Sequence, residues 1–146
     1  MMADKRVEVM LESNLESVNE AEQVAVRFAG EAGFSEEDQH KVGMAVRESM
    51  VNAVLHGNHY DPQKKAGLRL EFERGRLVIT ITDQGEGFEV DRVPNPLAEE
   101  NLLRQSGRGI FLIRAFMDEL HVRRLEPKGT EVRMVKYPSA ENSKEE

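Results

Sequence analysis

The spacing of apolar residues in the first part of the chain predicts one strand followed by two helices. Residues 6–12 alternate between apolar and charged side chains, which is typical of a strand with one buried face. Apolar residues recur every three or four positions over 16–32, and Gly33 follows, where a left-handed helix cap favours glycine. Ser35, with an acid three residues later, resembles a capping box and predicts a second helix that continues to about Leu55.

The rest of the chain predicts two hairpins and one short helix. Strands are predicted over 68–74 and 76–83, joined at an Arg-Gly-Arg turn, and over 119–125 and 130–137, joined at a Pro-Lys-Gly turn. A helix is predicted over 109–117. Several strands pair one apolar face with one charged face, so we expect helices to cover one side of the sheet and water to cover the other.

These elements predict an α+β fold of the two-layer sandwich type, in which a mixed, mostly antiparallel β-sheet carries about three α-helices on one face. The length of 146 residues suits a single domain, which we expect over 1–138, followed by a disordered polar tail at 139–146. The stretch 88–106 is rich in proline and polar residues and is expected to form a mobile loop.

Composition narrows the function classes. The net charge of −7, with acidic and basic residues interleaved, argues against direct nucleic-acid binding, which favours clustered lysine and arginine. The chain has no cysteine, so neither a disulfide nor a thiolate metal site holds it together. It has no apolar run of the ~20 residues that a membrane span needs, and its first residues lack the apolar core of a signal peptide. We therefore expect a cytoplasmic protein.

Two residues of the second predicted helix suggest chemistry. Glu48 and Asn52 are four apart, so they share a helix face, which lies beside the apolar stripe expected to contact the sheet. The stripe consists of Val42, Ala45, Val46, Met50 and Ala53. A carboxylate and an amide one turn apart can together hold Mg²⁺ and activate a hydroxyl, although an ordinary surface pair would show the same spacing. His56 and Asn58 are interpreted as structural residues that shape the end of this helix.

Asp83 stands at an unusual position for a charged residue. It continues the inward-facing apolar row of its strand, where a charge without a partner is costly to bury. An exocyclic amine of adenine would supply the needed donor, and Gly85 and Gly87 would let a ligand approach the backbone. A plain Asp-x-Gly turn is the alternative interpretation.

Two further segments contain glycine at suggestive positions. In 106–112, a glycine pair flanks an arginine just ahead of a predicted helix, and backbone N–H groups at a helix start bind phosphate. A flexible loop that leads into a helix would have the same composition. Gly129 and Thr130 stand at a strand start and, on their own, indicate only a hairpin turn.

In this order the four segments resemble the N, G1, G2 and G3 boxes of the GHKL (Bergerat-fold) ATPases. Within that superfamily, the chain looks most like the bacterial anti-sigma factor serine/threonine protein kinases. The resemblance rests on the phrases at 48–58, 61–62 and 107–118, and it extends from about residue 6 to residue 137. It implies the same two-layer fold, with ATP and Mg²⁺ as ligands.

The resemblance also implies a role for each motif residue. Glu48 would be the catalytic general base, Asn52 would ligate Mg²⁺, and Asp83 would recognise the adenine amine. The stretch 88–106 would act as the ATP lid. Arg104, which no motif position fixes, is included as a further phosphate contact. The residues assigned to nucleotide binding are Asn52, Asp83, Gly85, Gly87, Arg104, Gly107, Arg108, Gly109 and Thr130.

By the same resemblance, the protein would be both an anti-sigma factor and a protein serine/threonine kinase. It would sequester a sigma factor and phosphorylate a serine on an antagonist (anti-anti-sigma) protein, as a homodimer, in a partner switch that responds to ATP versus ADP. Two alternatives stay open. The chain could be a nucleotide-gated binding module without kinase activity, or a partner-switch kinase that controls an effector other than a sigma factor.

Overall fold

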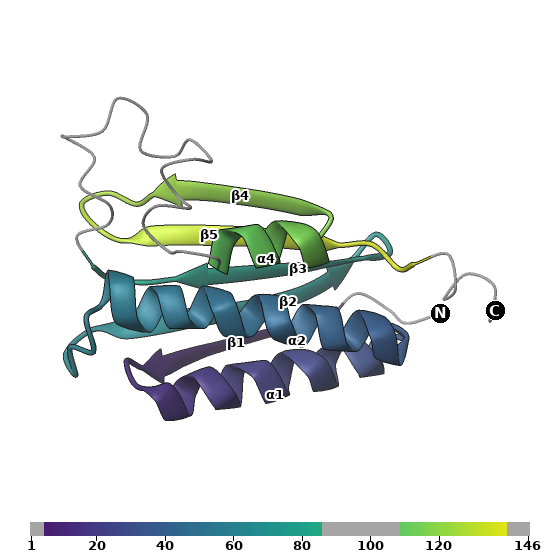
Figure 1. Cartoon of the computed structure of the whole chain (residues 1–146), viewed down its shortest axis with the longest axis horizontal. Coiled ribbons are helices and arrows are strands. Elements are labelled where there is room, and N and C mark those ends of the chain that lie inside the picture. Colours follow the sequence, from purple (N-terminus) through teal and green to yellow (C-terminus); the bar gives the residue numbers. More distant parts are fainter. Residues whose placement is uncertain (1–4, 86–108, 140–146) are drawn as a thin grey trace.

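The structure is a computed structural model that describes residues 5–85 and 109–139 (Figure 1). This part of the chain forms two layers, a five-stranded β-sheet and a set of helices packed on one of its faces. The predicted α+β two-layer fold is confirmed. The predicted lid loop at 88–106 lies outside the described residues, and so does the predicted tail apart from Ser139, so the limits of the domain stay a prediction.

The five strands of the described residues pair antiparallel throughout, so the mixed sheet that the sequence predicted is wrong for this part of the chain. Its strands lie in the order β1-β2-β3-β5-β4, so β1 and β4 form the two edges. The sequence predicted all five strands, but β2 begins at Lys65 rather than at residue 68, because β1 pairs with it as far as Glu12. The strands are β1 (Lys5–Glu12), β2 (Lys65–Glu73), β3 (Arg76–Thr82), β4 (Glu119–Arg124) and β5 (Thr130–Lys136).

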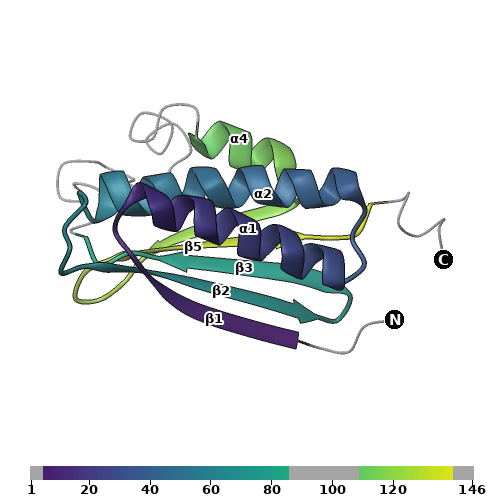
Figure 2. The same ribbon diagram turned by 90° about the horizontal axis from the view of Figure 1, so that it is seen from below.

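The helices α1 (Leu15–Glu31), α2 (Glu36–Val51) and α4 (Gly109–Phe116) lie together over one face of the sheet, with α2 between the other two (Figure 2). Side chains cap the first two helices. The Asn14 Oδ1 accepts from the Ser17 backbone N–H (2.9 Å), and the Ser35 Oγ accepts from the Asp38 N–H (3.1 Å), as the sequence predicted for Ser35. Among the described residues, no helix is long and apolar enough to cross a membrane.

The second helix ends differently from the prediction. The α-helix stops at Val51, and residues Asn52–Gly57 continue it as a π-helix, η1. The wider turn is closed by the Asn58 N–H, which donates to the carbonyl oxygen of Ala53 (2.8 Å). The predicted regular helix to about Leu55 is therefore wrong in its last turn. Apolar spacing could not indicate this change, since the π-turn depends on contacts that Asn58 makes with distant segments.

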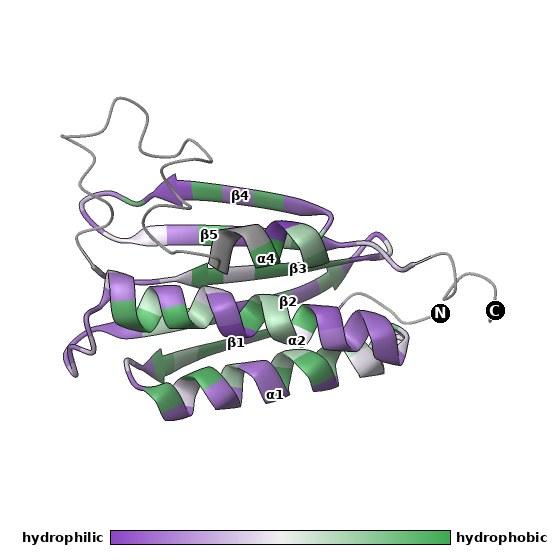
Figure 3. Ribbon diagram, in the orientation of Figure 1, coloured by the Kyte–Doolittle hydropathy of each residue, from purple (hydrophilic) through white to green (hydrophobic). Residues whose placement is uncertain are grey.

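The core fills the space between the sheet and the helices. Hydrophobic residues alternate with hydrophilic ones along α1 and β4, as Figure 3 shows, which is the pattern of elements with one buried face. All five residues of the predicted apolar stripe on the second helix are buried. The largest fully buried side chains come from both layers: Met50, Leu68, Leu70, Leu77, Ile79, Ile81, Ile113, Met134, Val18, Val42, Val46 and Val54.

The opposite face of the sheet is only partly exposed to water. Val78, Thr80 and Val135 lie on this face, yet their exposed fractions are 2%, 3% and 0%. In the sheet register, Thr80 lies between Arg69 on β2 and Arg133 on β5, and both arginines are half-buried. Long arginine stems can cover smaller neighbours while the charged group stays in water. The expectation of a fully solvated face is therefore wrong for the centre of the sheet.

Candidate functional site

Glu48 and Asn52 lie on the flank of α2 that faces away from α1. The α1 flank is identified by Gly43, which packs on Val26, and by Arg47, which forms an ion pair with α1. Helical geometry places Glu48 and Asn52 about one turn apart on the other flank, the side on which α4 lies (Figure 1). Both side chains are half-buried, so a ligand can reach them.

Asp83 follows directly after β3 and is buried, with an exposed fraction of 8%. Its Oδ1 accepts hydrogen bonds from the backbone N–H groups of Gly85 (3.0 Å) and Thr130 (3.2 Å). Its own N–H donates to the Thr130 carbonyl (3.0 Å), which ties the end of β3 to the start of β5. Burial raises the pKa of the Asp83 carboxyl above its usual value, and the two backbone hydrogen bonds only partly oppose this rise.

Three glycines at and beside Asp83 make contacts that exclude a side chain. A Cβ on Gly57, the last residue of η1, would collide with the Oδ2 of Asp83 and lie 2.5 Å from its Cγ. A Cβ on Gly85 would collide with the Gly57 carbonyl, and a Cβ on Gly129 would collide with the Asp83 carbonyl. Gly57 therefore packs on the carboxylate itself, Gly85 packs on Gly57, and Gly129 packs on the Asp83 backbone.

Asn58 connects the segments around Asp83 and is fully buried. Its Nδ2 donates to the Ser13 Oγ (2.8 Å) and to the Lys65 carbonyl (3.0 Å), and its Oδ1 accepts from the Gln84 N–H (2.8 Å). The Gln84 side chain in turn accepts from the Lys65 N–H (2.7 Å). Asn58 is thus the structural residue that the sequence predicted, and it reaches the loop that carries Asp83.

The structure brings part of the predicted site together. Asp83, Gly85 and Thr130 are in direct contact, and Asn52 begins the π-helix whose last residue touches Asp83. Glu48 lies one turn before Asn52, and Gly109 begins α4, as predicted. The predicted phosphate-binding residues Gly87, Arg104, Gly107 and Arg108 lie outside the described residues.

Sequence reasoning did not include Gly57 and Gly129 among the site residues, although both lie against Asp83. The His-Gly-Asn turn after the second predicted helix, and the glycine before Thr130, were available as signals. Both belong to segments that carry the family resemblance, yet neither was assigned a role in the site, because nothing local indicates which distant side chain a glycine faces.

A match to a known family covers almost the whole described fold. Residues 11–136 match the family described as histidine kinase-like ATPase domain. The chain belongs to this family. As a histidine kinase-like ATPase domain, it is expected to use ATP, in agreement with the resemblance that the motifs carry.

Among relatives of this ATPase domain, an anti-sigma F factor from Bacillus cytotoxicus is 29% identical over 142 residues, which cover 94% of this chain and 97% of the relative. An anti-sigma F factor from Clostridium botulinum is 33% identical over 133 residues, 84% of this chain and 92% of the relative. The serine-protein kinase RsbW from Staphylococcus epidermidis is 35% identical over 115 residues, 73% of this chain and 70% of the relative. The predicted class, an anti-sigma factor protein serine/threonine kinase of the GHKL superfamily, is confirmed by these relatives. The roles of the individual residues stay predictions.

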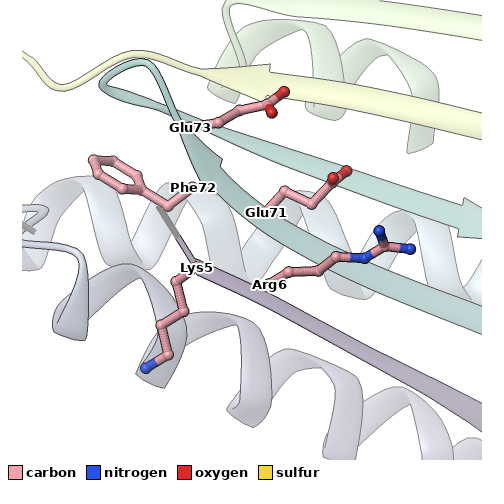
Figure 4. A pocket seen from close by; sticks show the side chains of 5 residues that line it. All are labelled: Lys5, Arg6, Glu71, Phe72 and Glu73. Carbon is pink, nitrogen blue, oxygen red and sulfur yellow. The ribbon is translucent and has the colours of Figure 1, made fainter. Parts of the chain in front are cut away.

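A separate hollow lies at the end of the sheet opposite Asp83, and none of the predicted site residues lines it. It has a volume of about 200 Å³ and is lined by residues of β1 and β2 (Figure 4). Lys5 and Phe72, which are register partners, lie at the helix side of this hollow, and the Lys5 Nζ is 5.7 Å from the ring centroid of Phe28. The remaining lining residues are Arg6, Glu71 and Glu73.

Proposed function

We propose that this chain binds ATP with Mg²⁺, transfers the γ-phosphate to a serine of an antagonist protein, and sequesters a sigma factor when that antagonist is not available. The carrying observation is the buried Asp83 carboxylate, which contacts Gly57, the last residue of the helical segment that also carries Glu48 and Asn52. Membership of the ATPase family and the names of the relatives support the same activity.

The surroundings of Asp83 fit the adenine of ATP. A buried carboxylate is costly unless it is hydrogen-bonded, and backbone donors bind its Oδ1. The exocyclic amine of adenine would add a third donor to this group. Gly57 packs its backbone directly against the carboxylate, and a side chain at this position would displace the group from where it is held.

Asn52 is the described residue that would hold Mg²⁺. The ion takes oxygen ligands and usually binds through one or two protein groups together with nucleotide phosphates and water. The described residues contain no cluster of three or more histidine, aspartate or glutamate side chains that could hold a metal ion. When bound, Mg²⁺ would neutralise part of the phosphate charge during transfer.

Glu48 would accept the proton of the attacking serine. In the transfer, the serine oxygen forms a bond to the γ-phosphorus, the bond to the β-phosphate oxygen breaks, and ADP leaves. The hydroxyl proton moves to the Glu48 carboxylate, whose half-buried position on the α4 side of α2 leaves it accessible to a substrate. A module that only bound nucleotide would have no use for a base at this position.

The partners follow from the same proposal. The relatives named anti-sigma F factor support a sigma factor as the protein that is held, and the kinase activity requires an antagonist that carries the phosphorylated serine. We also propose that the chain is a homodimer and that it resides in the cytoplasm. Sedimentation of the purified protein at several concentrations would test the dimer directly.

A transfer assay tests the proposed activity. The purified chain is incubated with γ-labelled ATP, Mg²⁺ and candidate antagonist proteins encoded by the same genome, and Glu48→Gln is treated in parallel. We expect label on a serine of one candidate with the wild type and none with the variant. Tight ATP binding without transfer to any candidate would contradict the kinase proposal and favour a nucleotide-gated binding module.

A second assay tests the sigma factor. The chain is mixed with each sigma factor of the same genome, in ATP or in ADP, and complexes are separated by size. We expect one sigma factor to co-elute in a nucleotide-dependent manner. If transfer occurs but no sigma factor binds in either nucleotide, the kinase controls a different effector.

A further inference from the structure

Gly57, the last residue of the π-helix, is in direct contact with the Asp83 carboxylate, which is proposed to bind the adenine ring of ATP. Gly57 is buried, and a single added methyl group there would collide with Asp83 Oδ2. The backbone of Gly57 is helical, since its φ is not positive as those of Gly33, Gly75 and Gly129 are. The absence of a side chain at Gly57 is therefore required by Asp83 and not by the helix.

Asn58, the next residue in the chain, holds the loop of Asp83, Gln84 and Gly85. The Asn58 Oδ1 accepts the N–H of Gln84, which lies between Asp83 and Gly85 in the chain. The two Nδ2 hydrogen bonds of Asn58 go to Ser13 and Lys65, so its amide cannot rotate without losing buried bonds. Gly57 limits where the carboxylate can lie, and Asn58 fixes the backbone that carries it.

From these contacts we infer that Gly57 and Asn58 are positioning residues for base selection: the end of the π-helix sets the position at which Asp83 meets the 6-amino group of a purine. The inference rests on the proposed function of Asp83 as the adenine reader. It also gives the π-turn a purpose, since a regular α-helix would direct the chain differently after Asn52 and would not bring Gly57 to the same place.

The affinities for ATP and for inosine triphosphate, measured side by side, show whether a variant moves Asp83 or merely destabilises the fold. Inosine triphosphate carries a carbonyl where ATP carries the amine, and it shares the ribose and phosphates. Loss of a hydrogen bond to a charged group lowers affinity about tenfold or more, so wild type is expected to prefer ATP over inosine triphosphate by at least that factor. A change that merely destabilises the fold would weaken both nucleotides together.

Gly57→Ala is the first variant, with Gly43→Ala as its matched control. Gly43 is also a buried helical glycine, and its Cβ would lie 2.8 Å from Val26 Cγ2, remote from Asp83. We expect Gly57→Ala to reduce the preference for ATP about tenfold while inosine triphosphate binding stays near wild type. Gly43→Ala is expected to keep the wild-type preference. Calorimetric titration of the full chain with each nucleotide and Mg²⁺ provides the affinities.

Asn58→Ala is the second variant, in case Gly57→Ala does not fold. It removes the acceptor for the Gln84 N–H, and we expect a similar loss of preference. Its control is Ser13→Ala, which removes a bond on the other side of the Asn58 amide and leaves the Gln84 bond in place. The control is expected to retain the preference for ATP.

Asp83→Asn distinguishes the proposal that Asp83 binds adenine from the proposal that Gly57 and Asn58 position Asp83. If Asp83→Asn abolishes the preference but Gly57→Ala and Asn58→Ala both keep it, the positioning role is overturned and the adenine assignment stands. If wild type shows no preference, or Asp83→Asn retains it, Asp83 does not read the base and both proposals fail. Adding Gly57→Ala to Asp83→Asn is expected to cause no further loss of selectivity, because both changes act on the same carboxylate.

Discussion

At the scale of single residues, Asp83 illustrates a conflict between stability and function. Its carboxylate is buried, and desolvation raises its pKa in spite of hydrogen bonds from Gly85 and Thr130 and the positive charge of Lys64. An asparagine would keep an acceptor for the two backbone donors and would carry no charge. We therefore expect Asp83→Asn to increase the free energy of unfolding at neutral pH while it weakens ATP binding.

The pH dependence of stability tests this expectation. Because the folded-state pKa of Asp83 lies above the unfolded value, the folded protein retains a proton where the unfolded chain has already lost it. The Asp83 contribution is therefore most favourable below the unfolded pKa and is lost as pH rises through the folded pKa. In urea unfolding across this pH range, the free energy of unfolding of Asp83→Asn should exceed that of wild type by an amount that grows with pH. A constant difference would contradict the raised pKa.

Glu48 makes a different prediction, because its proposed role concerns the reaction and not the binding of ATP. Glu48→Gln keeps the size and polarity of this half-buried side chain and removes its ability to accept a proton. We expect kcat for transfer to the antagonist to fall by roughly 10²- to 10⁴-fold, the usual contribution of a general base, with an unchanged Kd for ATP. A variant that transfers phosphate at the wild-type rate would exclude Glu48 as the base.

At the scale of elements, the β2–β3 hairpin offers a stabilising change. Arg74 and Gly75 both have positive φ, 53° and 75°, as the two central residues of a type I′ turn require. Glycine adopts this conformation readily, whereas arginine does so at a cost of about 1–2 kcal/mol. Arg74→Asn should raise the free energy of unfolding by about 0.5–1 kcal/mol, since asparagine is favoured at this position. Thermal and urea unfolding provide the measurement.

Arg74→Ala is the control for the hairpin. It removes the same side chain but keeps a residue that is unfavourable at positive φ, so we expect no gain in stability. An equal gain in both variants would mean that the arginine side chain, and not its backbone conformation, is the source of the cost. Neither variant should alter ATP binding, because the turn lies at the end of β3 opposite Asp83.

The strands and α-helices were largely predictable from local sequence pattern, and the π-helix η1 is the exception. Alternation predicted the strands, and the spacing of apolar residues with the Ser35 cap predicted α2. The π-helix was not predictable, because it is fixed by Asn58, whose amide bonds reach Ser13 and Gln84, 45 and 26 residues away. The burial of Asp83 could be predicted from its strand, but its donor Thr130, 47 residues away, could not be derived from spacing.

At the scale of the whole molecule, a buried ion pair joins the last strand to the start of α2. The Lys136 Nζ lies 3.8 Å from the Asp38 Oδ1, and the two side chains are 8% and 1% exposed. Asp38 Oδ2 also accepts the N–H of Ser139, just beyond β5. The sequence predicted Asp38 only as part of a helix cap, since nothing in the local pattern indicates a lysine 98 residues further along (136 − 38).

Lys136→Met tests whether this pair holds the C-terminal strand in place. Removal of one partner from a buried ion pair costs about 3–5 kcal/mol, and we expect a loss of about 2–3 kcal/mol here, because the separation is long and the Ser139 N–H still serves Asp38. Urea unfolding at neutral pH gives the value. Asp38→Asn combined with Lys136→Met should recover part of the loss, because the double variant buries no charge. If the double variant is as unstable as the sum of the single changes, the two side chains do not interact and the strand is held by β-sheet pairing and apolar packing alone.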